Sequence, residues 1–292
     1  MSQKYVYING ELIPSERAAA PLYDHSLLYG DGAFEGIRTY NGKIFKLDEH
    51  LTRLYHSASA LAIDLPVTQD NMRRSVLELC RMNDHLNGYI RLTITRGAFL
   101  GLDPKNYKGT ANIYISTEQL ALYPREMYET GLAMVTVSTR IPPSFVIDPR
   151  IKSTGKYVNN VQAKMEANRA GAGEGLMLSL EGYVAECTGD NIFVVHQGGI
   201  KTPPPGACGL VGITRNTVID LARADGIAVD EVMMTQYDVY TSDECFLTGT
   251  GAEVIPAVSL DARKIGSGIP GPVTRRVIEL FHAYTMQSGV PF

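Results

Sequence analysis

The sequence contains few cysteines, and they are widely separated. There is no Cys-x-x-Cys pair and no histidine at ligand spacing among Cys80, Cys187, Cys208 and Cys245. This pattern argues against a zinc site or a disulfide framework, and we expect no metal. Cys80 and Cys245 lie in apolar contexts, where buried free thiols are typical. Cys187 directly follows Glu186, so we expect it near a site but without a catalytic role.

Long apolar runs and concentrated positive charge are also missing. No run reaches the roughly 18 apolar residues of a membrane span, and residues 1–5 lack the apolar core of a signal peptide. The 27 Lys and Arg residues are dispersed and are outnumbered by 31 Asp and Glu, which argues against a nucleic-acid surface. We therefore expect a cytoplasmic protein without membrane or nucleic-acid partners. Its 292 residues suggest one large domain or two.

The first part of the chain has the pattern of an α+β domain. Alternating Tyr5–Ile8, the turn Asn9-Gly10 and the following apolar residues predict an opening β-hairpin. Asp48 is expected to cap one helix, and Thr68 a second helix that runs to about Met82. Two stretches rich in β-branched and aromatic residues, 89–95 and 111–116, predict strands.

The pattern then lapses around Pro124, which is a helix and strand breaker. We predict a small N-terminal domain at 1–118, an interdomain loop at 119–130 and a larger domain at 131–292. In the larger domain a strand at 132–138, a loop from Pro142 and a helix at 158–170 are expected. The glycine-rich stretch 171–175 follows a helix and precedes a strand, the reverse of a dinucleotide-binding loop, so it predicts a helix stop and turn.

Two later glycine-rich turns, at 203–212 and 248–251, are each expected to join a strand to a helix. The first places Gly212, Ile213 and Thr214 at a helix start, where backbone N–H groups and the helix dipole favour a phosphate. The turn at 248–251 can supply a second set of backbone amides. Arg53 could add a fixed charge, because a guanidinium grips phosphate with paired donors.

A lysine, a tyrosine and a later carboxylate are the residue types that a pyridoxal 5′-phosphate enzyme needs. Lys152 can form a Schiff base with the cofactor aldehyde, Tyr157 can hydrogen-bond the ring oxygen, and Glu186 can hold the pyridine nitrogen protonated. Each residue alone is weak evidence, because an isolated lysine is usually a solvated surface charge. Together they predict a cofactor site.

These motifs occur in an order that resembles the fold type IV pyridoxal phosphate enzymes, and the chain looks like a branched-chain amino acid aminotransferase from residue 7 to the helix start near 271–274. The motifs are 29–38, 48–54, 89–91, Lys152 with Tyr157, 186–191, 212–215 and 248–253. The resemblance implies a mixed α+β and α/β fold. A smaller N-terminal α+β domain would precede a larger, β-barrel-like C-terminal domain with surrounding helices.

The resemblance also implies a role for each matching residue. Lys152 would carry the cofactor and move the substrate proton. Cofactor binding would involve Arg53, Tyr157, Glu186, Leu210, Ile213, Thr214 and Thr250. The substrate pocket would contain Phe34, Tyr89, Arg91, Tyr123, Gly251 and Ala252, with Tyr29, Leu100 and Leu102 supplied by a neighbouring subunit. A homodimer, or a hexamer of dimers, is expected.

The implied reaction is ping-pong transamination of leucine, isoleucine and valine with 2-oxoglutarate. D-amino acid aminotransferases and aminodeoxychorismate lyases share the lysine, glutamate and phosphate motifs, so both remain alternatives. The stretches 34–38, 89–91 and 100–102 favour the branched-chain enzymes, whereas 95–97 resembles a D-amino acid enzyme and Ala98-Phe99 replaces the usual residues. A carrier or sensor that binds the cofactor without turnover is a third alternative, against which the complete Lys152, Tyr157 and Glu186 set argues.

Overall fold

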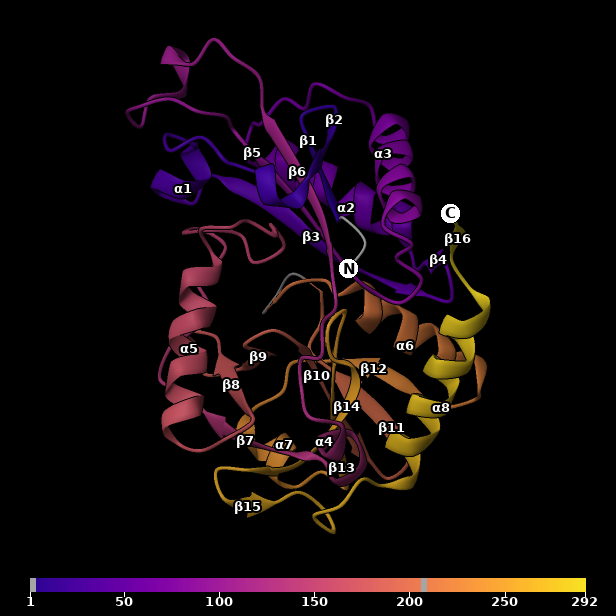
Figure 1. Ribbon diagram of the computed structural model, residues 1–292. Coiled ribbons are helices and arrows are strands. Elements are labelled where there is room, and N and C mark those ends of the chain that lie inside the picture. The colour runs from indigo at the N-terminus through magenta and orange to yellow at the C-terminus, as the bar shows by residue number, and fades with distance from the viewer. Residues whose placement is uncertain (1–3, 206–208) are drawn as a thin grey trace. The chain divides into compact units, whose positions relative to one another are not determined.

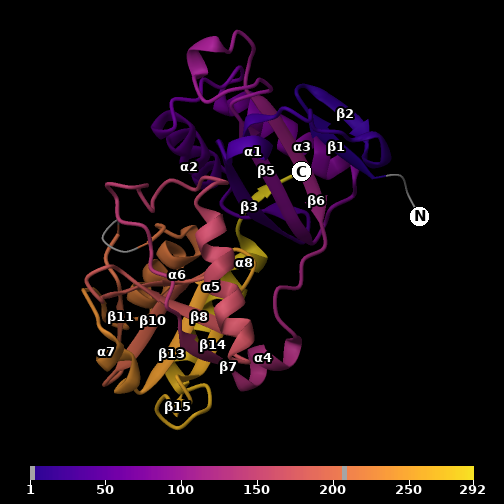
Figure 2. The same ribbon diagram turned by 90° about the vertical axis from the view of Figure 1, so that its left-hand side faces the viewer.

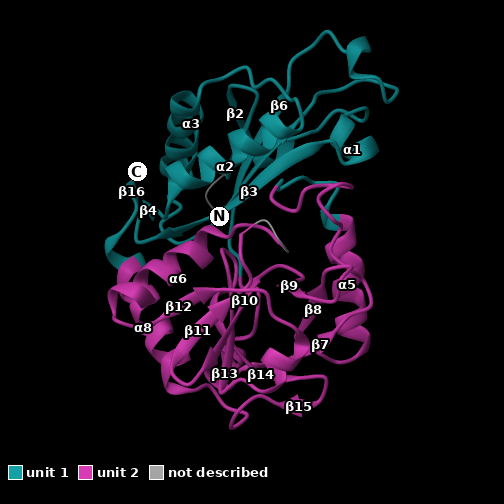
Figure 3. Ribbon diagram, turned by 180° about the vertical axis from the view of Figure 1, so that it is seen from behind, with its two compact units in different colours: residues 1–120, 151–157, 285–292 teal, residues 121–150, 158–284 magenta. Residues whose placement is uncertain are grey.

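The computed structural model describes residues 4–205 and 209–292, which form two compact units (Figure 3). Unit 1 comprises residues 1–120, 151–157 and 285–292, and unit 2 comprises residues 121–150 and 158–284. The sequence pattern had assigned 151–157 and 285–292 to the C-terminal domain. They belong to unit 1 because each pairs with a strand there: Ser153 bridges Ala33, and Val290 pairs with Ile44.

Unit 1 contains a seven-stranded antiparallel sheet in the order β16-β4-β3-β5-β6-β1-β2 (Figure 1). Its strands are β1 (Tyr5–Ile8), β2 (Glu11–Pro14), β3 (Gly32–Tyr40), β4 (Lys43–Ile44), β5 (Gly88–Thr95), β6 (Asn112–Glu118) and β16 (Val290–Pro291). The predicted opening hairpin is confirmed, with Ile8 opposite Glu11 across the Asn9-Gly10 turn. Both long strand predictions, now β5 and β6, are confirmed within two residues.

The helices of unit 1 are α1 (His25–Tyr29), α2 (Leu47–Ala60) and α3 (Gln69–Met82), with short 3₁₀ turns at Ser15–Arg17 and Pro104–Asn106. The apolar faces of α2 and α3 pack on one face of the sheet, through Leu54 and Val76 against Ile37 and Ile90. Figure 1 shows these two helices beside β3 and β6. The other face of the sheet therefore remains available for polar and aromatic side chains.

Unit 2 contains a nine-stranded mixed sheet in the order β12-β11-β10-β13-β14-β7-β8-β9, with β15 paired to β14. Its strands are β7 (Leu132–Thr136), β8 (Glu174–Leu178), β9 (Val184–Cys187), β10 (Asn191–His196), β11 (Gly199–Thr202), β12 (Val229–Glu231), β13 (Glu244–Gly249), β14 (Glu253–Leu260) and β15 (Arg263–Lys264). The pairs β11/β12, β14/β7 and β7/β8 are parallel. Unlike unit 1, this sheet thus mixes the two pairings.

Five helices accompany this sheet: α4 (Arg125–Thr130), α5 (Tyr157–Arg169), α6 (Ile213–Ala224), α7 (Gln236–Tyr240) and α8 (Pro272–Gln287). Helix α5 runs beside β8 in Figures 1 and 2, and its Ala163 and Ala167 share a core cluster with Met177 and Ala185. The predicted helix at 158–170 and the helix start near 272 are confirmed. Among the described residues, no helix is both long enough and apolar enough to cross a membrane.

Three local predictions are wrong. Helix α2 begins at Leu47 with Lys46 at its N-cap, so Asp48 lies in the first turn and pairs with Arg73 instead of capping. The stretch predicted as a loop at 119–130 contains α4, because a proline such as Pro124 is compatible with a helix start, where the first N–H groups have no intrahelical acceptor.

The third error concerns the turn at 248–251. It leads into strand β14 and not into a helix, since Gly249 pairs with Glu253 and the β-branched Val254 and Ile255 continue the antiparallel ladder with β13. In contrast, Thr68 accepts a hydrogen bond from the Asn71 N–H and caps α3 as predicted.

Candidate active site

The segment that carries Lys152 pairs with the first residues of β3 in unit 1. The strand β4 pairs only with Thr39 and Tyr40, so this edge of β3 is not covered by β4 near Gly32 and Phe34. The Phe34 N–H donates to the Lys152 carbonyl over 3.0 Å, and the Thr154 N–H donates to the Gly32 carbonyl over 2.8 Å. The Lys152 N–H in turn donates to the Ser57 hydroxyl of α2 over 3.2 Å. These bonds fix the backbone of the lysine against the sheet, although more than 110 positions separate the two segments in the chain.

Two glycines allow this close approach. Gly30 has a φ of +71°, and a Cβ atom there would lie only 2.6 Å from the Gly155 Cα. A side chain at position 30 would therefore be both strained in its backbone and in collision with another backbone. Gly30 is thus required by the packing of the segment that carries Lys152.

The side chains of Lys152 and Tyr157 meet within unit 1. The Lys152 Nζ donates to the Tyr157 phenol oxygen over 2.9 Å. The Phe34 ring packs edge-on against Tyr157, with 4.7 Å between ring centroids, and the Arg91 guanidinium lies 3.5 Å from the Phe34 centroid. An amine, a phenol and a cation-faced aromatic ring therefore lie together in unit 1.

Arg53 lies on α2, and its side chain pairs with Glu35 of β3 and interacts electrostatically with Tyr157. Its Nε and Nη2 donate to the two carboxylate oxygens of Glu35 over 2.7 and 2.8 Å, and His50 Nδ1 lies 2.7 Å from the same carboxylate. Glu35 is fully buried; burial opposes its ionisation, but the Arg53 charge and these hydrogen bonds lower its pKa to about 2. Burial lowers the pKa of His50. Glu35 thus fixes the guanidinium that was predicted to bind phosphate.

Tyr89 crosses β3 at a position without a side chain. A Cβ atom on Gly36 would lie 1.9 Å from the Tyr89 phenol oxygen, so only a glycine at 36 allows this orientation. Gly36 pairs with Arg91 and Phe34 pairs with Thr93 in the antiparallel ladder, which places all of them on the face away from α2 and α3. The predicted substrate residues Phe34, Tyr89 and Arg91 therefore share one face.

This geometry predicts the effect of Gly36→Ala. The new methyl group must displace the Tyr89 ring while the sheet stays paired, so we expect the KM for the amino acid to rise by up to about 10²-fold, since small misplacements at a site are costly. Steady-state kinetics measure this, with Gly199→Ala on β11 as the matched control, because a Cβ there meets only ordinary contacts. A Gly36→Ala effect of equal size in a Tyr89→Ala background would contradict the explanation.

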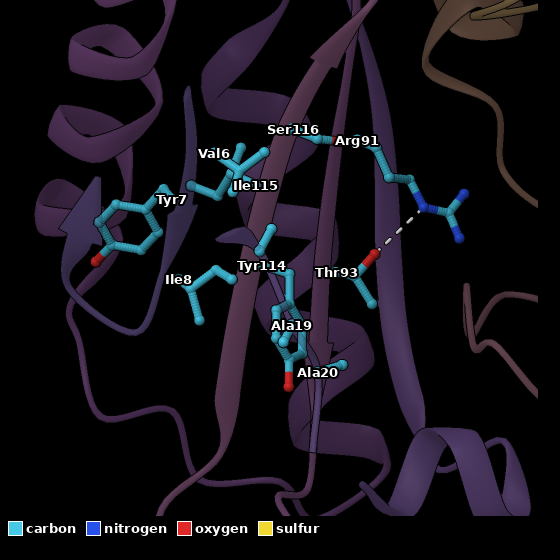
Figure 4. A pocket seen from close by; sticks show the side chains of 11 residues that line it. Val6, Tyr7, Ile8, Ala19, Ala20, Arg91, Thr93, Tyr114, Ile115 and Ser116 are labelled. Atoms are coloured by element: carbon cyan, nitrogen blue, oxygen red, sulfur yellow. Dashed lines mark hydrogen bonds between the residues drawn. The ribbon is translucent and has the colours of Figure 1, made fainter. Parts of the chain in front are cut away.

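A pocket of about 370 Å³ opens on the same face of the unit 1 sheet (Figure 4). Its walls include Val6 and Ile8 of β1, Thr93 of β5 and the loop 18–20. Arg91 Nε donates to the Thr93 hydroxyl over 3.2 Å, and Figure 4 shows the guanidinium extending beyond Thr93, on the side away from Ile8. Arg91 therefore lines this pocket, with its guanidinium directed away from the β1 side chains.

The three residues predicted to serve a neighbouring subunit are exposed in this chain. Tyr29, Leu100 and Leu102 have 46%, 64% and 74% of their surface accessible. The buried Asp24 caps α1 through the Ser26 N–H and accepts hydrogen bonds from Thr95, Asn112 and Tyr114. The hydrogen bonds of Asp24 thus anchor the start of helix α1, which presents the exposed Tyr29.

In unit 2, Glu186 lies on β9 with its carboxylate against the 209–210 backbone. Its Oε2 accepts the Leu210 N–H over 2.8 Å, and the Asn191 amide donates to the Leu210 carbonyl over 2.8 Å. A Cβ on Gly209 would lie 2.7 Å from Glu186 Oε2, so a glycine is needed there. The predicted residues Glu186 and Leu210 are therefore adjacent.

The two predicted phosphate turns also lie in unit 2. Helix α6 begins at Ile213 after Gly212, and no side chain among the described residues caps it, so its first N–H groups point outward. Thr248, just before Thr250, is fully buried, and its hydroxyl has no hydrogen-bond partner within the described part of the chain. The start of α6 can therefore offer backbone N–H groups to an anion, and the second turn follows a buried hydroxyl without a described partner.

Tyr123 lies inside unit 2. Its hydroxyl is 2.8 Å from Glu174 Oε2 and 3.0 Å from Asp190 Oδ2, and its predicted substrate contact stays a prediction. Ala252 is buried at the end of the same turn as Gly251. Sequence analysis missed Glu35, His50, Glu174 and Asp190, because the burial of an ionisable side chain has no local sequence signature.

The cysteines agree with the sequence where they are described. Cys80, Cys187 and Cys245 are buried free thiols, and burial raises the pKa of each. Cys208 lies outside the described residues. A buried thiol with a raised pKa is unreactive, as expected for Cys187.

The chain belongs to the class IV aminotransferases, because the model of the amino-transferase class IV family matches residues 32–260. A relative from Methanocaldococcus jannaschii is 44% identical over 98% of both chains. The Pseudomonas aeruginosa branched-chain-amino-acid aminotransferase is 37% identical, over 93% of this chain and 90% of its own.

Comparison with solved structures confirms the mixed α/β fold of the fold type IV enzymes. The T.th. branched-chain amino acid aminotransferase with pyridoxamine 5′-phosphate superposes with a TM-score of 0.93 at 36% identity, covering 98% of this chain and 95% of that one. The Escherichia coli branched-chain amino acid aminotransferase has the same TM-score at 32% identity, covering 97% and 95%.

Class IV aminotransferases use pyridoxal 5′-phosphate, and each unit, taken by itself, contains residues with the chemistry that this cofactor needs. In unit 1, Lys152 offers an amine beside a phenol. In unit 2, the Thr248 hydroxyl and the start of α6, both without a side-chain partner in the ranges 4–205 and 209–292, suit a phosphate dianion. The buried Glu186 carboxylate suits a protonated ring nitrogen.

Proposed function

We propose that this chain transfers the amino group of leucine, isoleucine and valine to 2-oxoglutarate, in a ping-pong reaction that uses pyridoxal 5′-phosphate. The observation that carries this proposal is the 2.9 Å contact between Lys152 Nζ and the Tyr157 hydroxyl beside Phe34 and Arg91. The activity of the similar enzymes named above supports the same substrate class.

The predicted roles of the site residues remain part of this proposal. When bound, the cofactor supplies an electron sink for the pair left by removal of the substrate α-proton. Lys152 would hold the cofactor and then move that proton, and the Tyr157 hydroxyl, which accepts from the Lys152 amine, would hydrogen-bond the ring oxygen. Glu186 holds the ring nitrogen, while Arg53 and the backbone at 213–214 and Thr250 bind the phosphate.

The substrate pocket must accept an aliphatic side chain in one half-reaction and a γ-carboxylate in the other. Phe34 offers an apolar ring, and the Arg91 guanidinium over that ring offers a cation. Tyr89, Gly251 and Ala252 would complete the pocket. This combination explains how one site takes both substrates.

We expect Arg91→Met to separate the two half-reactions. Loss of a charge-assisted hydrogen bond should weaken 2-oxoglutarate and glutamate by about 10- to 100-fold, whereas leucine should change much less. Single-turnover measurements with each substrate test this, and Arg125→Met on the exposed start of α4 is the matched control. Equal losses for leucine and 2-oxoglutarate would contradict the assignment of Arg91.

The alternative substrates are tested on the same purified protein. L-Leucine should bleach the visible absorption of the bound cofactor, and D-alanine should leave it unchanged. A response to D-alanine alone would make the chain a D-amino acid aminotransferase, and release of pyruvate from aminodeoxychorismate would make it a lyase. Arg96, in the stretch that resembles the D-amino acid enzymes, donates to Asp31 and to the carbonyls of Leu61 and Ala62, which supports a structural role for it.

The proposal includes the assembly and the location of the protein. The exposed Tyr29, Leu100 and Leu102 fit a homodimer, or a hexamer of dimers, in which they complete the pocket of a neighbouring copy. Sedimentation of the purified chain tests the assembly. The dispersed charge and the chemistry of the substrates fit a cytoplasmic enzyme.

A further inference from the structure

Glu174 is a buried acid that the proposed reaction does not use. It is the first residue of β8 and is 2% exposed. Its Oε1 accepts the N–H of Gly175 over 2.6 Å and the N–H of Thr188 over 3.2 Å, and it also accepts the Thr188 hydroxyl. A buried carboxylate needs such donors, so these bonds are held firmly.

Tyr123 connects Glu174 to a second buried acid, Asp190. The Tyr123 hydroxyl joins Glu174 Oε2 to Asp190 Oδ2, over 2.8 and 3.0 Å. Burial and these two acids raise the pKa of Tyr123, so it remains a neutral phenol. Lys164 Nζ lies 3.4 Å from Glu174 Oε2 and adds a positive charge. Glu174, Thr188, Tyr123, Asp190 and Lys164 thus form a cluster of five side chains inside unit 2, joined through Glu174 and Tyr123.

This cluster holds the turn between β9 and β10, which follows Glu186 directly. The turn is closed by the Cys187 N–H donating to the Asp190 carbonyl over 2.7 Å. Asn160 donates to the Thr188 carbonyl over 2.8 Å from α5. Both ends of the turn are therefore tied down, one by Glu174 through Thr188 and the other through Asp190.

The same turn reaches both predicted phosphate turns. A Cβ on Gly249 would lie 2.0 Å from Asp190 Oδ1, and a Cβ on Gly212 would lie 2.0 Å from Asn191 Oδ1. The Glu186 carboxylate accepts the Leu210 N–H, and the Asn191 amide donates to the Leu210 carbonyl. A shift of the 187–191 turn would therefore move Glu186, Gly212 and Gly249 together.

We propose that Glu174 is a positioning residue for cofactor binding: through Thr188, Tyr123 and Asp190 it holds the turn that places Glu186 and the two phosphate turns. Tyr123 acts in this cluster and not as a substrate contact. The inference rests on the proposed function, because it takes Glu186 and the turns as the cofactor residues.

The test uses Glu174→Gln, Glu174→Ala and Tyr123→Phe in the full chain. The matched control is Glu166→Gln on α5, whose carboxylate accepts the hydroxyls and N–H groups of Ser138 and Thr139 in the same unit. Calorimetric titration of the cofactor-free protein with pyridoxal 5′-phosphate gives the dissociation constant. Thermal unfolding of the cofactor-free protein and the pH dependence of the visible absorption of the loaded protein are measured in parallel.

We expect Glu174→Ala to weaken cofactor binding by about tenfold or more, as loss of one buried hydrogen-bond acceptor implies, with partial rescue in Glu174→Gln. The absorption midpoint should shift as well, because Glu186 faces the ring nitrogen. The control should change neither. Unchanged binding and an unchanged midpoint in Glu174→Ala would overturn the proposal, as would lower thermal stability with neither effect.

Tyr123→Phe separates the two assignments of that residue. Weaker cofactor binding with an unchanged ratio of substrate KM values supports the cluster, whereas a raised KM for leucine with unchanged cofactor binding overturns it. If wild-type protein binds the cofactor but does not react with leucine, the proposed function fails, and the binding measurements still decide the role of Glu174.

Discussion

Replacement of Lys152 by alanine is expected to lower kcat for transamination of leucine by about 10⁴-fold, because the amine that moves the substrate proton in the proposed mechanism is removed. The fold should survive, since the backbone of residue 152, and not its side chain, pairs with β3. Stopped-flow and steady-state assays measure the rate, and circular dichroism measures the fold.

Lys264→Ala is the control for this substitution, because Lys264 is an exposed lysine on β15. Its kcat should match that of the wild type. If Lys152→Ala retains more than about one hundredth of the wild-type rate, general acid–base catalysis by this amine would be too small, and the assignment would be wrong.

Replacement of Glu35 by alanine is expected to reduce the free energy of unfolding by about 3–5 kcal/mol, the usual cost of removing one partner of a buried ion pair. The substitution leaves Arg53 and His50 without their shared carboxylate beneath the sheet of unit 1. Chemical denaturation measures the loss. Glu118→Ala, on β6 with an exposed partner Lys4, should change stability by less than about 0.5 kcal/mol.

The double variant Glu35→Ala/Arg53→Ala provides the internal check. When both charges are absent, neither remains buried alone, so the double variant should be more stable than the sum of the single losses predicts. Strict additivity would show that the two side chains are not coupled.

The Glu35, Arg53 and His50 side chains also predict that unit 1 becomes less stable at low pH. The pKa of Glu35 falls from its ordinary 4.5 to about 2 in the folded chain, so the unfolded state binds the proton first as the pH falls. The stabilisation by Glu35 is complete above pH 4.5 and is lost as the pH falls towards 2. His50, with a pKa lowered from 6.5, adds to this loss below pH 6.5. Denaturation curves at several pH values should show the dependence, and Glu35→Ala should weaken it.

Much of the candidate site could be predicted because its chemistry depends on short segments. Tyr157 follows Lys152 by five positions, and Gly212 and Ile213 begin a helix, so short segments were enough to expect a cofactor lysine with a tyrosine and an anion-binding helix start. The contact between the amine and the phenol was seen only in the structure. The hairpin at Asn9-Gly10 and the cap at Thr68 are local in the same sense.

The wrong secondary-structure predictions arose where position in the fold, and not local residue preference, decided the structure. Thr248 to Gly251 contains the residues of an ordinary turn, and only the pairing of β13 with β14 decides that a strand follows. The sequence around Pro124 predicts a loop, yet Pro124 stands at the start of α4, since a proline breaks a helix only in its interior.

The sequence by itself determined which chemistry the protein carries: a lysine, a tyrosine, a glutamate and glycine-rich turns in the order of the class IV aminotransferases. Only the tertiary structure decided how these groups are held. It pairs residues 151–157 with β3, and it brings the Glu35 carboxylate to Arg53. It also brings the Glu174 carboxylate to Thr188, in the turn that follows β9. The physical reason is that a buried charge must find its donors across the fold, and no local pattern records which ones it finds.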